Sequence, residues 1–111
     1  MTQSNNTPFL AGTLELIVLQ LLEGEPTNGY DLTLRIQAIS KDVLKVNAGS
    51  LYPALYRLEQ RGLLKPTWVT SETGRRTKSY SVTSAGRKQL AEQRADWKRF
   101  TGALAAILQT S

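Results

Sequence analysis

A short cationic run in the second half of the chain carries side chains suited to binding phosphate. Gly74 is followed by Arg75, Arg76 and Lys78, which puts three positive charges within four residues. Charges packed this closely repel one another, and phosphate groups would neutralise them. Gly74 also permits close approach of a backbone. The run therefore predicts contact with a polyanion.

The positive charge of the chain is concentrated in its second half, which also contains this run. Residues 1–49 hold three basic and five acidic side chains, a net charge of −2, whereas residues 50–111 hold eleven and four, a net charge of +7. Arg87 and Lys88 stand in the first turn of an expected helix, where positive charge opposes the helix dipole. Side chains that oppose the local helix dipole in this way are typical of a functional surface. A solvated basic face is the alternative that charge alone leaves open.

The residue types that enzymes use most often are scarce. The chain contains no Cys and no His, which removes thiolate nucleophiles, imidazole acid–base chemistry, disulfides and the usual zinc ligands. The carboxylates are scattered, with no pair that suggests catalysis: Glu15, Asp31, Glu59, Glu72 and Asp96. We expect no enzymatic activity, no metal site and no cofactor.

Residues 50–61 are predicted to form the helix that presents the second set of binding residues. Leu51, Leu55 and Leu58 have the spacing of one helix face and are expected to point into a core. Ser50 is the expected N-cap. The remaining candidates can address base edges or phosphates: Tyr52, Pro53, Tyr56, Arg57 and Gln60, with Ser50 at the start. The wet side of an ordinary amphipathic helix is the alternative interpretation.

An extended pattern follows this helix. Residues 64–69 and 76–83 flank a turn over residues 70–74, which predicts a two-stranded hairpin with the cationic run at its tip. Pro66 has no amide hydrogen and so confines its strand to a sheet edge.

Two further helices are expected earlier in the chain. Residues 12–23 have apolar positions at helical spacing. Asn28 with Asp31 resembles a helix cap, so a second helix is expected to begin there. Residues 1–9 are polar and are expected to form a mobile arm, and residues 40–49 a loop.

A long final helix is predicted from a cap at Ser84 to about Leu108, roughly 37 Å at 1.5 Å per residue. Its apolar stripe is longer than a three-helix core can cover, so a second copy of the chain is the expected partner. The expected dimer interface comprises Leu14, Val18, Leu90, Trp97, Phe100, Leu104, Ile107 and Leu108. A monomeric core helix is the alternative. Trp97 is interpreted first as packing and second as a platform for a flat aromatic effector.

Three helices followed by a hairpin are typical of a winged helix-turn-helix, which binds double-stranded DNA. The expected fold is mainly α with a small β-hairpin: a DNA-binding domain over residues 10–83 and a dimerisation helix over residues 84–111. No basic residue precedes Arg35, and the apolar stretch 16–22 is too short to span a bilayer. We expect a cytoplasmic protein that does not contact membranes.

The sequence resembles the PadR family of bacterial transcriptional regulators over about residues 12–100. The matching segments are Gly12-Thr13-Leu14-Glu15-Leu16, Asn28-Gly29-Tyr30, residues 49–59 with Gly-Ser-Leu-Tyr-Pro, Gly62-Leu63-Leu64, Gly74-Arg75-Arg76 through Tyr80, and Thr83 with Ala85-Gly86-Arg87. The chain is similar to the subgroup with a short C-terminal region. The resemblance implies a winged-helix dimer that represses transcription, with recognition helix 50–61 and wing 64–83. We expect it to bind a palindromic operator. It also implies an aromatic drug-binding position at Trp97.

A different class of function is left open by the residues themselves. A winged-helix module that binds an acidic protein, without specific DNA binding, would use the same basic face.

Overall fold

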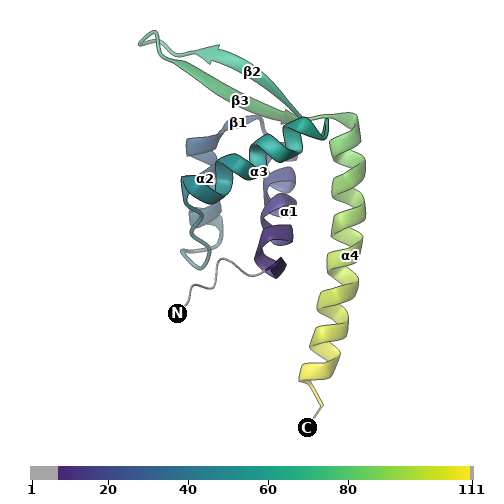
Figure 1. The fold of residues 1–111 in the computed structure, drawn as a ribbon. Coiled ribbons are helices and arrows are strands. Elements are labelled where there is room, and N and C mark those ends of the chain that lie inside the picture. Colours follow the sequence, from purple (N-terminus) through teal and green to yellow (C-terminus); the bar gives the residue numbers. More distant parts are fainter. Residues whose placement is uncertain (1–7, 111) are drawn as a thin grey trace.

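The computed structural model describes residues 8–110 and shows four helices and a three-stranded antiparallel sheet (Figure 1). The elements, in chain order, are α1 (Pro8–Gly24), β1 (Thr27–Asn28), α2 (Gly29–Ile39), α3 (Ala48–Gln60), β2 (Leu64–Thr70), β3 (Arg76–Val82) and α4 (Ser84–Leu108). Mainly helical content with one small sheet confirms the expected fold class. Residues 1–7 of the predicted arm lie outside the described part, and Pro8 and Phe9 belong to α1.

The core lies where α1, α2 and α3 meet the base of the sheet. Apolar side chains at helical spacing fill it, and those with no exposed surface are Val18, Leu19, Leu32, Leu51, Ala54, Leu55 and Leu58. Leu64 and Tyr80 close the core from the sheet side. Truncating one of these leucines to Ala costs about 2–5 kcal/mol of stability. The buried leucines of α3 therefore fix which face of that helix points to solvent.

The sheet differs from the predicted two-stranded hairpin because β1 adds a third strand. The strand order is β1-β3-β2, with Thr27 opposite Tyr80 and Asn28 opposite Ser79. A strand of two residues has no detectable alternation, which is why the sequence pattern missed it. β2 is an edge strand, as Pro66 predicts.

Three helix caps were predicted, at Asn28, Ser50 and Ser84, and the one at Asn28 is correct. Asn28 accepts a hydrogen bond from the Asp31 amide at 2.8 Å and donates from its own amide group to the Asp31 carboxylate at 3.0 Å. Ser50 was expected to cap α3 but is wrong, because Asn47 Oδ1 accepts from the Ser50 amide at 2.9 Å and the helix begins at Ala48. Asn47 and Ser50 are both short polar side chains near the start of α3, and either type can cap a helix. The spacing of the apolar residues did not show which of the two is the cap.

The final helix begins one residue earlier than the predicted cap at Ser84 implies. Thr83, rather than Ser84, is the N-cap: its Oγ1 accepts from the Gly86 amide at 3.0 Å and donates to the Gly62 carbonyl at 2.7 Å. The Thr83 amide also donates to the Leu63 carbonyl at 3.1 Å. The start of α4 is thus tied to the base of the wing, and the helix continues past the start of α1 (Figure 1).

Candidate nucleic-acid interface

The outer face of α3 is neutral at its centre and charged on both flanks. At 100° per residue, Pro53, Tyr56 and Gln60 lie opposite the buried leucines, and all three are exposed, Tyr56 at 60%. Arg57 lies on one flank, and Tyr52 and Glu59 lie on the other. Among the outward side chains, Tyr56 and Gln60 can therefore exchange hydrogen bonds without carrying charge.

The Arg57 flank is held by a carboxylate of α1. Glu15 lies 3.5 Å from Arg57 Nε and 3.2 Å from Arg61 Nη1, and the two guanidinium groups remain about half exposed. Glu15 is much less exposed than either arginine. The predicted base reader Arg57 is thus paired within the protein, together with Arg61, which the sequence pattern did not single out.

The other flank of α3 is joined to the wing. Lys78 Nζ lies 3.2 Å from Glu59 Oε1 and 5.4 Å from the centroid of the Tyr80 ring. Its hydrogen bond to Glu59 raises the pKa of Lys78 above the ordinary value of 10.5. Lys78 therefore links β3 to α3, and part of its charge is already balanced by Glu59.

Tyr52 packs on the first turn of α2. A side chain at Gly29 would meet the Tyr52 ring, since a Cβ there would lie 2.6 Å from a ring carbon. Glycine is required at this position because the ring occupies the space of a side chain. Tyr52 forms one wall of a groove of about 720 Å³ whose other walls include Tyr30, Arg75, Arg76 and Lys78.

The tip of the wing is a tight turn that carries Arg75. The Ser71 amide donates to the Arg75 carbonyl at 2.8 Å, and the Gly74 amide donates to the Ser71 carbonyl at 2.9 Å. Gly74 has φ +85°, a conformation that side chains disfavour, and open space surrounds it. Gly74 is therefore needed for the turn itself. Among the described residues, the Arg75 guanidinium makes no ion pair.

An exposed aromatic ring lies beside Arg76. The Arg76 guanidinium carbon is 4.9 Å from the centroid of the Trp68 ring, which belongs to the neighbouring strand. Cross-strand partners share a face of the sheet, so the pairs Trp68–Lys78 and Thr70–Arg76 bring this ring and both cations to one side. The same face carries Leu64 and Tyr80 into the core.

Arg87 and Lys88 do not join this cluster. Arg87 donates to the Val82 carbonyl at 3.3 Å and to Ser84 Oγ at 3.1 Å, so it folds back over the start of α4. Lys88 is exposed on the same turn. Strands of seven residues separate this turn from the wing tip, about 20 Å at 3.3 Å per residue. The predicted phosphate-binding residues therefore form two groups at opposite ends of the wing.

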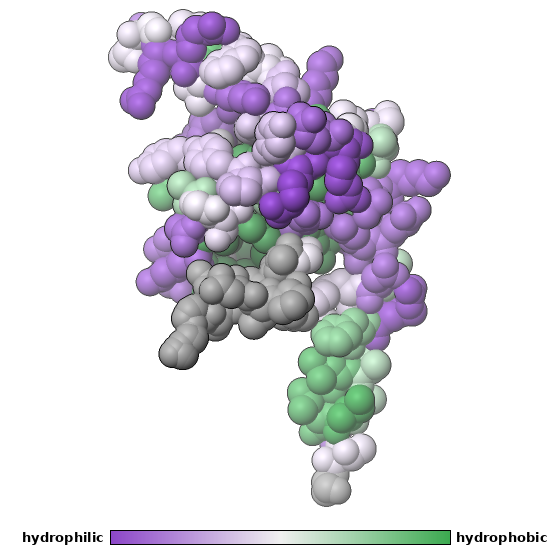
Figure 2. Space-filling model, viewed as in Figure 1, coloured by the Kyte–Doolittle hydropathy of each residue, from purple (hydrophilic) through white to green (hydrophobic). Residues whose placement is uncertain are grey.

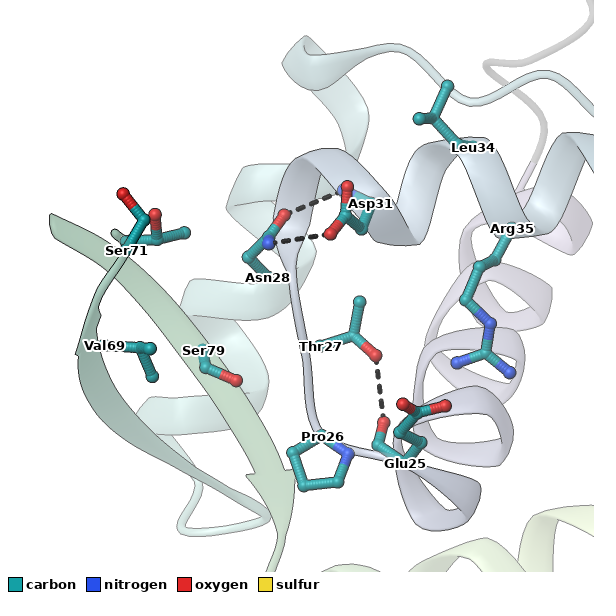
Figure 3. Close-up of a pocket in the computed structure, with 11 residues that line it drawn as sticks. Glu25, Pro26, Thr27, Asn28, Asp31, Leu34, Arg35, Val69, Ser71 and Ser79 are labelled. Atoms are coloured by element: carbon teal, nitrogen blue, oxygen red, sulfur yellow. Dashed lines mark hydrogen bonds between the residues drawn. The ribbon is translucent and has the colours of Figure 1, made fainter. Parts of the chain in front are cut away.

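A second groove lies on the opposite face of the wing (Figure 3). Val69, Ser71 and Ser79 line one side of it, and Asn28 with its bonded partner Asp31 lines the other; its volume is about 590 Å³. Its lining includes Glu25 and Asp31 as well as Arg35. Two carboxylates and one arginine make it less suited to a polyanion than the groove beside Tyr52, where three cations face the single carboxylate of Asp31.

Part of the predicted dimer interface lies inside the protomer. Leu14, Val18 and Leu90 are buried in its own core, so they offer little surface to a second copy. The rest of the stripe is accessible: Trp97 is half-buried, while Phe100, Leu104, Ile107 and Leu108 are exposed. Figure 2 shows this apolar surface near the end of α4. Helical spacing identifies an apolar side chain but cannot distinguish an inner neighbour from a partner molecule.

The described residues offer neither a membrane-spanning helix nor a metal-binding cluster. Within residues 8–110, no helix has the length and apolar character needed to cross a bilayer. The same residues include no cluster of three carboxylates that could hold a metal ion.

Comparison with known proteins gives one consistent family. The model of the transcriptional regulator PadR-like family matches residues 18–92. The transcriptional regulator Rv3488 of Mycobacterium tuberculosis is 35% identical over 86 residues, which are 78% of this chain and 77% of that protein.

Solved structures agree in both sequence and shape. A PadR-like transcription factor from Bacteroides fragilis is 33% identical with a TM-score of 0.75, over 89% of this chain and 93% of that one. A PadR-like transcriptional regulator from Bacillus cereus is 28% identical with a TM-score of 0.82, over 95% of this chain and 100% of that one. These relatives are transcriptional regulators and not enzymes, and their fold is a winged helix. The chain belongs to the PadR-like family of transcriptional regulators.

Proposed function

We propose that this protein is a sequence-specific DNA-binding repressor that acts as a homodimer on a palindromic operator. The observation that carries the proposal is the neutral, exposed face of α3 next to the cations of the wing. Family membership supports DNA binding as the mode of regulation. A cytoplasmic location follows from the proposal, because a bacterial chromosome lies there.

The two elements have separate tasks in this proposal. α3 enters the major groove, where Tyr56 and Gln60 exchange hydrogen bonds with base edges. The wing lies along the flanking backbone, where Arg75 and Arg76 bind phosphates. The remaining proposed contacts come from the start and flanks of α3 and from both ends of the wing: Ser50, Tyr52, Pro53, Arg57, Gly74, Lys78, Arg87 and Lys88.

Dimer formation is proposed through the end of α4. Phe100, Leu104, Ile107 and Leu108 form an apolar surface on a helix that extends beyond the rest of the protomer. A two-fold axis at this surface would place the α3 helices of the two protomers at the spacing of one DNA turn, ~34 Å. Ile107→Asp is expected to give a monomer by sedimentation equilibrium, because it would bury an unpaired charge. A dimer that persists in this variant rules out the α4 interface.

An aromatic effector is proposed to bind next to Trp97. This side chain lines a largely apolar groove of about 570 Å³, together with Leu16, Ile17 and Leu21 of α1. A planar ligand there would relieve repression by changing the angle of α4. A flat aromatic dye should quench Trp97 emission in Trp68→Phe protein, whereas unchanged emission at saturating dye excludes this site.

DNA binding is tested by gel shift with the DNA upstream of the protein's own gene. A shifted band that survives excess competitor DNA of random sequence supports sequence-specific binding. No shift at low salt contradicts the proposal and favours the protein-interaction module instead. Arg99→Ala is the control, since it removes an exposed arginine of α4 that pairs with Asp96.

A further inference from the structure

Trp68 is unusually exposed for its size. It has 55% of its surface accessible, whereas Tyr80, on the same face of the hairpin, has 6%. Tryptophan is highly buried in most proteins, because its ring contributes a large apolar area. Among the described residues β2 is the edge of the sheet, so the Trp68 ring has a cross-strand neighbour on one side only.

The immediate neighbours of the ring are cations. Lys78 is the direct cross-strand partner of Trp68, and the Arg76 guanidinium lies 4.9 Å from the ring centroid. A guanidinium stacked on an aromatic face remains able to donate hydrogen bonds from its edges. The ring and the guanidinium therefore form one flat surface, apolar at the ring and positive at its rim, which we name the Trp68–Arg76 platform.

We propose that the Trp68–Arg76 platform packs against the sugar–phosphate backbone of DNA, with Trp68 itself in contact with the deoxyribose rings at the edge of the minor groove. Charge complementarity identifies the partner: a row of phosphates satisfies Arg76, and the sugars between the phosphates offer apolar surface to the ring. The inference rests on the proposed function and assigns to it a contact residue on the wing.

A merely positioning role for Trp68 makes a different prediction, which a double-mutant cycle separates. If Trp68 acted only by holding Arg76, Trp68→Ala would have no further effect on affinity once Arg76 was replaced by Ala. Direct contact predicts that Trp68→Ala weakens DNA binding about tenfold in both backgrounds. Val69→Ala is the control, because it removes an exposed apolar side chain from the opposite face of the same strand.

The closing experiment observes the ring directly. The chain has two tryptophans, so Trp97→Phe protein reports Trp68 alone. A labelled duplex of random sequence is added at low salt, its anisotropy reports binding, and acrylamide quenching of Trp68 reports access to the ring. Bound duplex should lower the quenching constant at least about twofold, since the ring is then covered.

Bound duplex with unchanged quenching overturns the inference and leaves the proposed function intact. Constant anisotropy, meaning no binding, defeats the proposed function itself and the inference with it.

Discussion

Both α3 and the wing carry cations, but they differ in whether those cations are paired within the protein. The charged groups of α3 and its C-cap are paired within the protein, since Arg57 and Arg61 share Glu15 and Glu59 faces Lys78. At the wing tip, Arg75 makes no ion pair among the described residues and Arg76 only stacks on Trp68. Free cations attract any DNA, whereas neutral groups on a fixed face discriminate between bases. Under the proposed function, the wing would therefore supply affinity and α3 would supply specificity.

The wing should show the largest effect. Arg75→Ala/Arg76→Ala is expected to weaken binding to every DNA sequence about 50-fold near 0.1 M salt, because two phosphate contacts each contribute a slope of ~0.9 in log K against log salt. Fluorescence anisotropy titrations over a series of salt concentrations measure both quantities. An unchanged salt slope in this variant, with Arg99→Ala as the reference, removes the wing from the interface.

Substitutions on the outward face of α3 should have the second-largest effect, a loss of affinity for the operator and not for random DNA. Gln60→Ala and Tyr56→Ala are each expected to cost about 1–3 kcal/mol on the operator and little on random DNA, since a base-edge contact is lost. Competition titrations with the two kinds of duplex give the ratio. Equal losses on both would assign these side chains to the backbone.

Removing the carboxylate that pairs with Arg57 and Arg61 should leave these arginines free to bind phosphate, as the cations of the wing tip are. Glu15→Gln removes the carboxylate that pairs with Arg57 and Arg61, so binding to random DNA is expected to strengthen about fivefold with a steeper salt slope. Half-exposed ion pairs contribute little to folding, so the loss of stability is expected to stay below ~1 kcal/mol. Weaker binding to random DNA in a folded variant would show that these arginines do not reach phosphate.

The smallest effect concerns pH. The pKa of Lys78 is raised above 10.5 by Glu59, so Lys78 stays protonated below that value, and its contribution to stability is lost only as pH rises through the raised pKa. The chain has no His to titrate nearer neutrality. DNA affinity is therefore expected to be flat between about pH 6.5 and 9. A titration of DNA affinity with a midpoint near pH 7 would contradict this and would mean that another ionising group controls binding.

Much of this architecture follows from local chemistry in the sequence. Leucine spacing predicted the buried face of α3, the Asn28–Asp31 cap predicted the start of α2, and Pro66 predicted an edge strand. Each depends on neighbours within about one helix turn or one strand pair, which a sequence displays directly.

The missed features depend on contacts between distant segments. Glu15 meets α3 across more than forty residues, and the burial of Leu14 and Val18 depends on how α1 packs. Trp68 could have been found, since alternation along β2 places it on the face of Leu64 and the hairpin register sets it opposite Lys78. The separation of Arg87 from the wing tip required the strands to be placed in space.

The division of labour between α3 and the wing is tested most directly by hydroxyl-radical footprints of the unaltered protein and of Arg75→Ala/Arg76→Ala on the DNA upstream of the gene. The account predicts two protected half-sites about one helical turn apart, each with flanking backbone protection that disappears in the wing variant while the central protection remains at higher protein concentration. Identical footprints for the two proteins, or protection without paired half-sites, would contradict it.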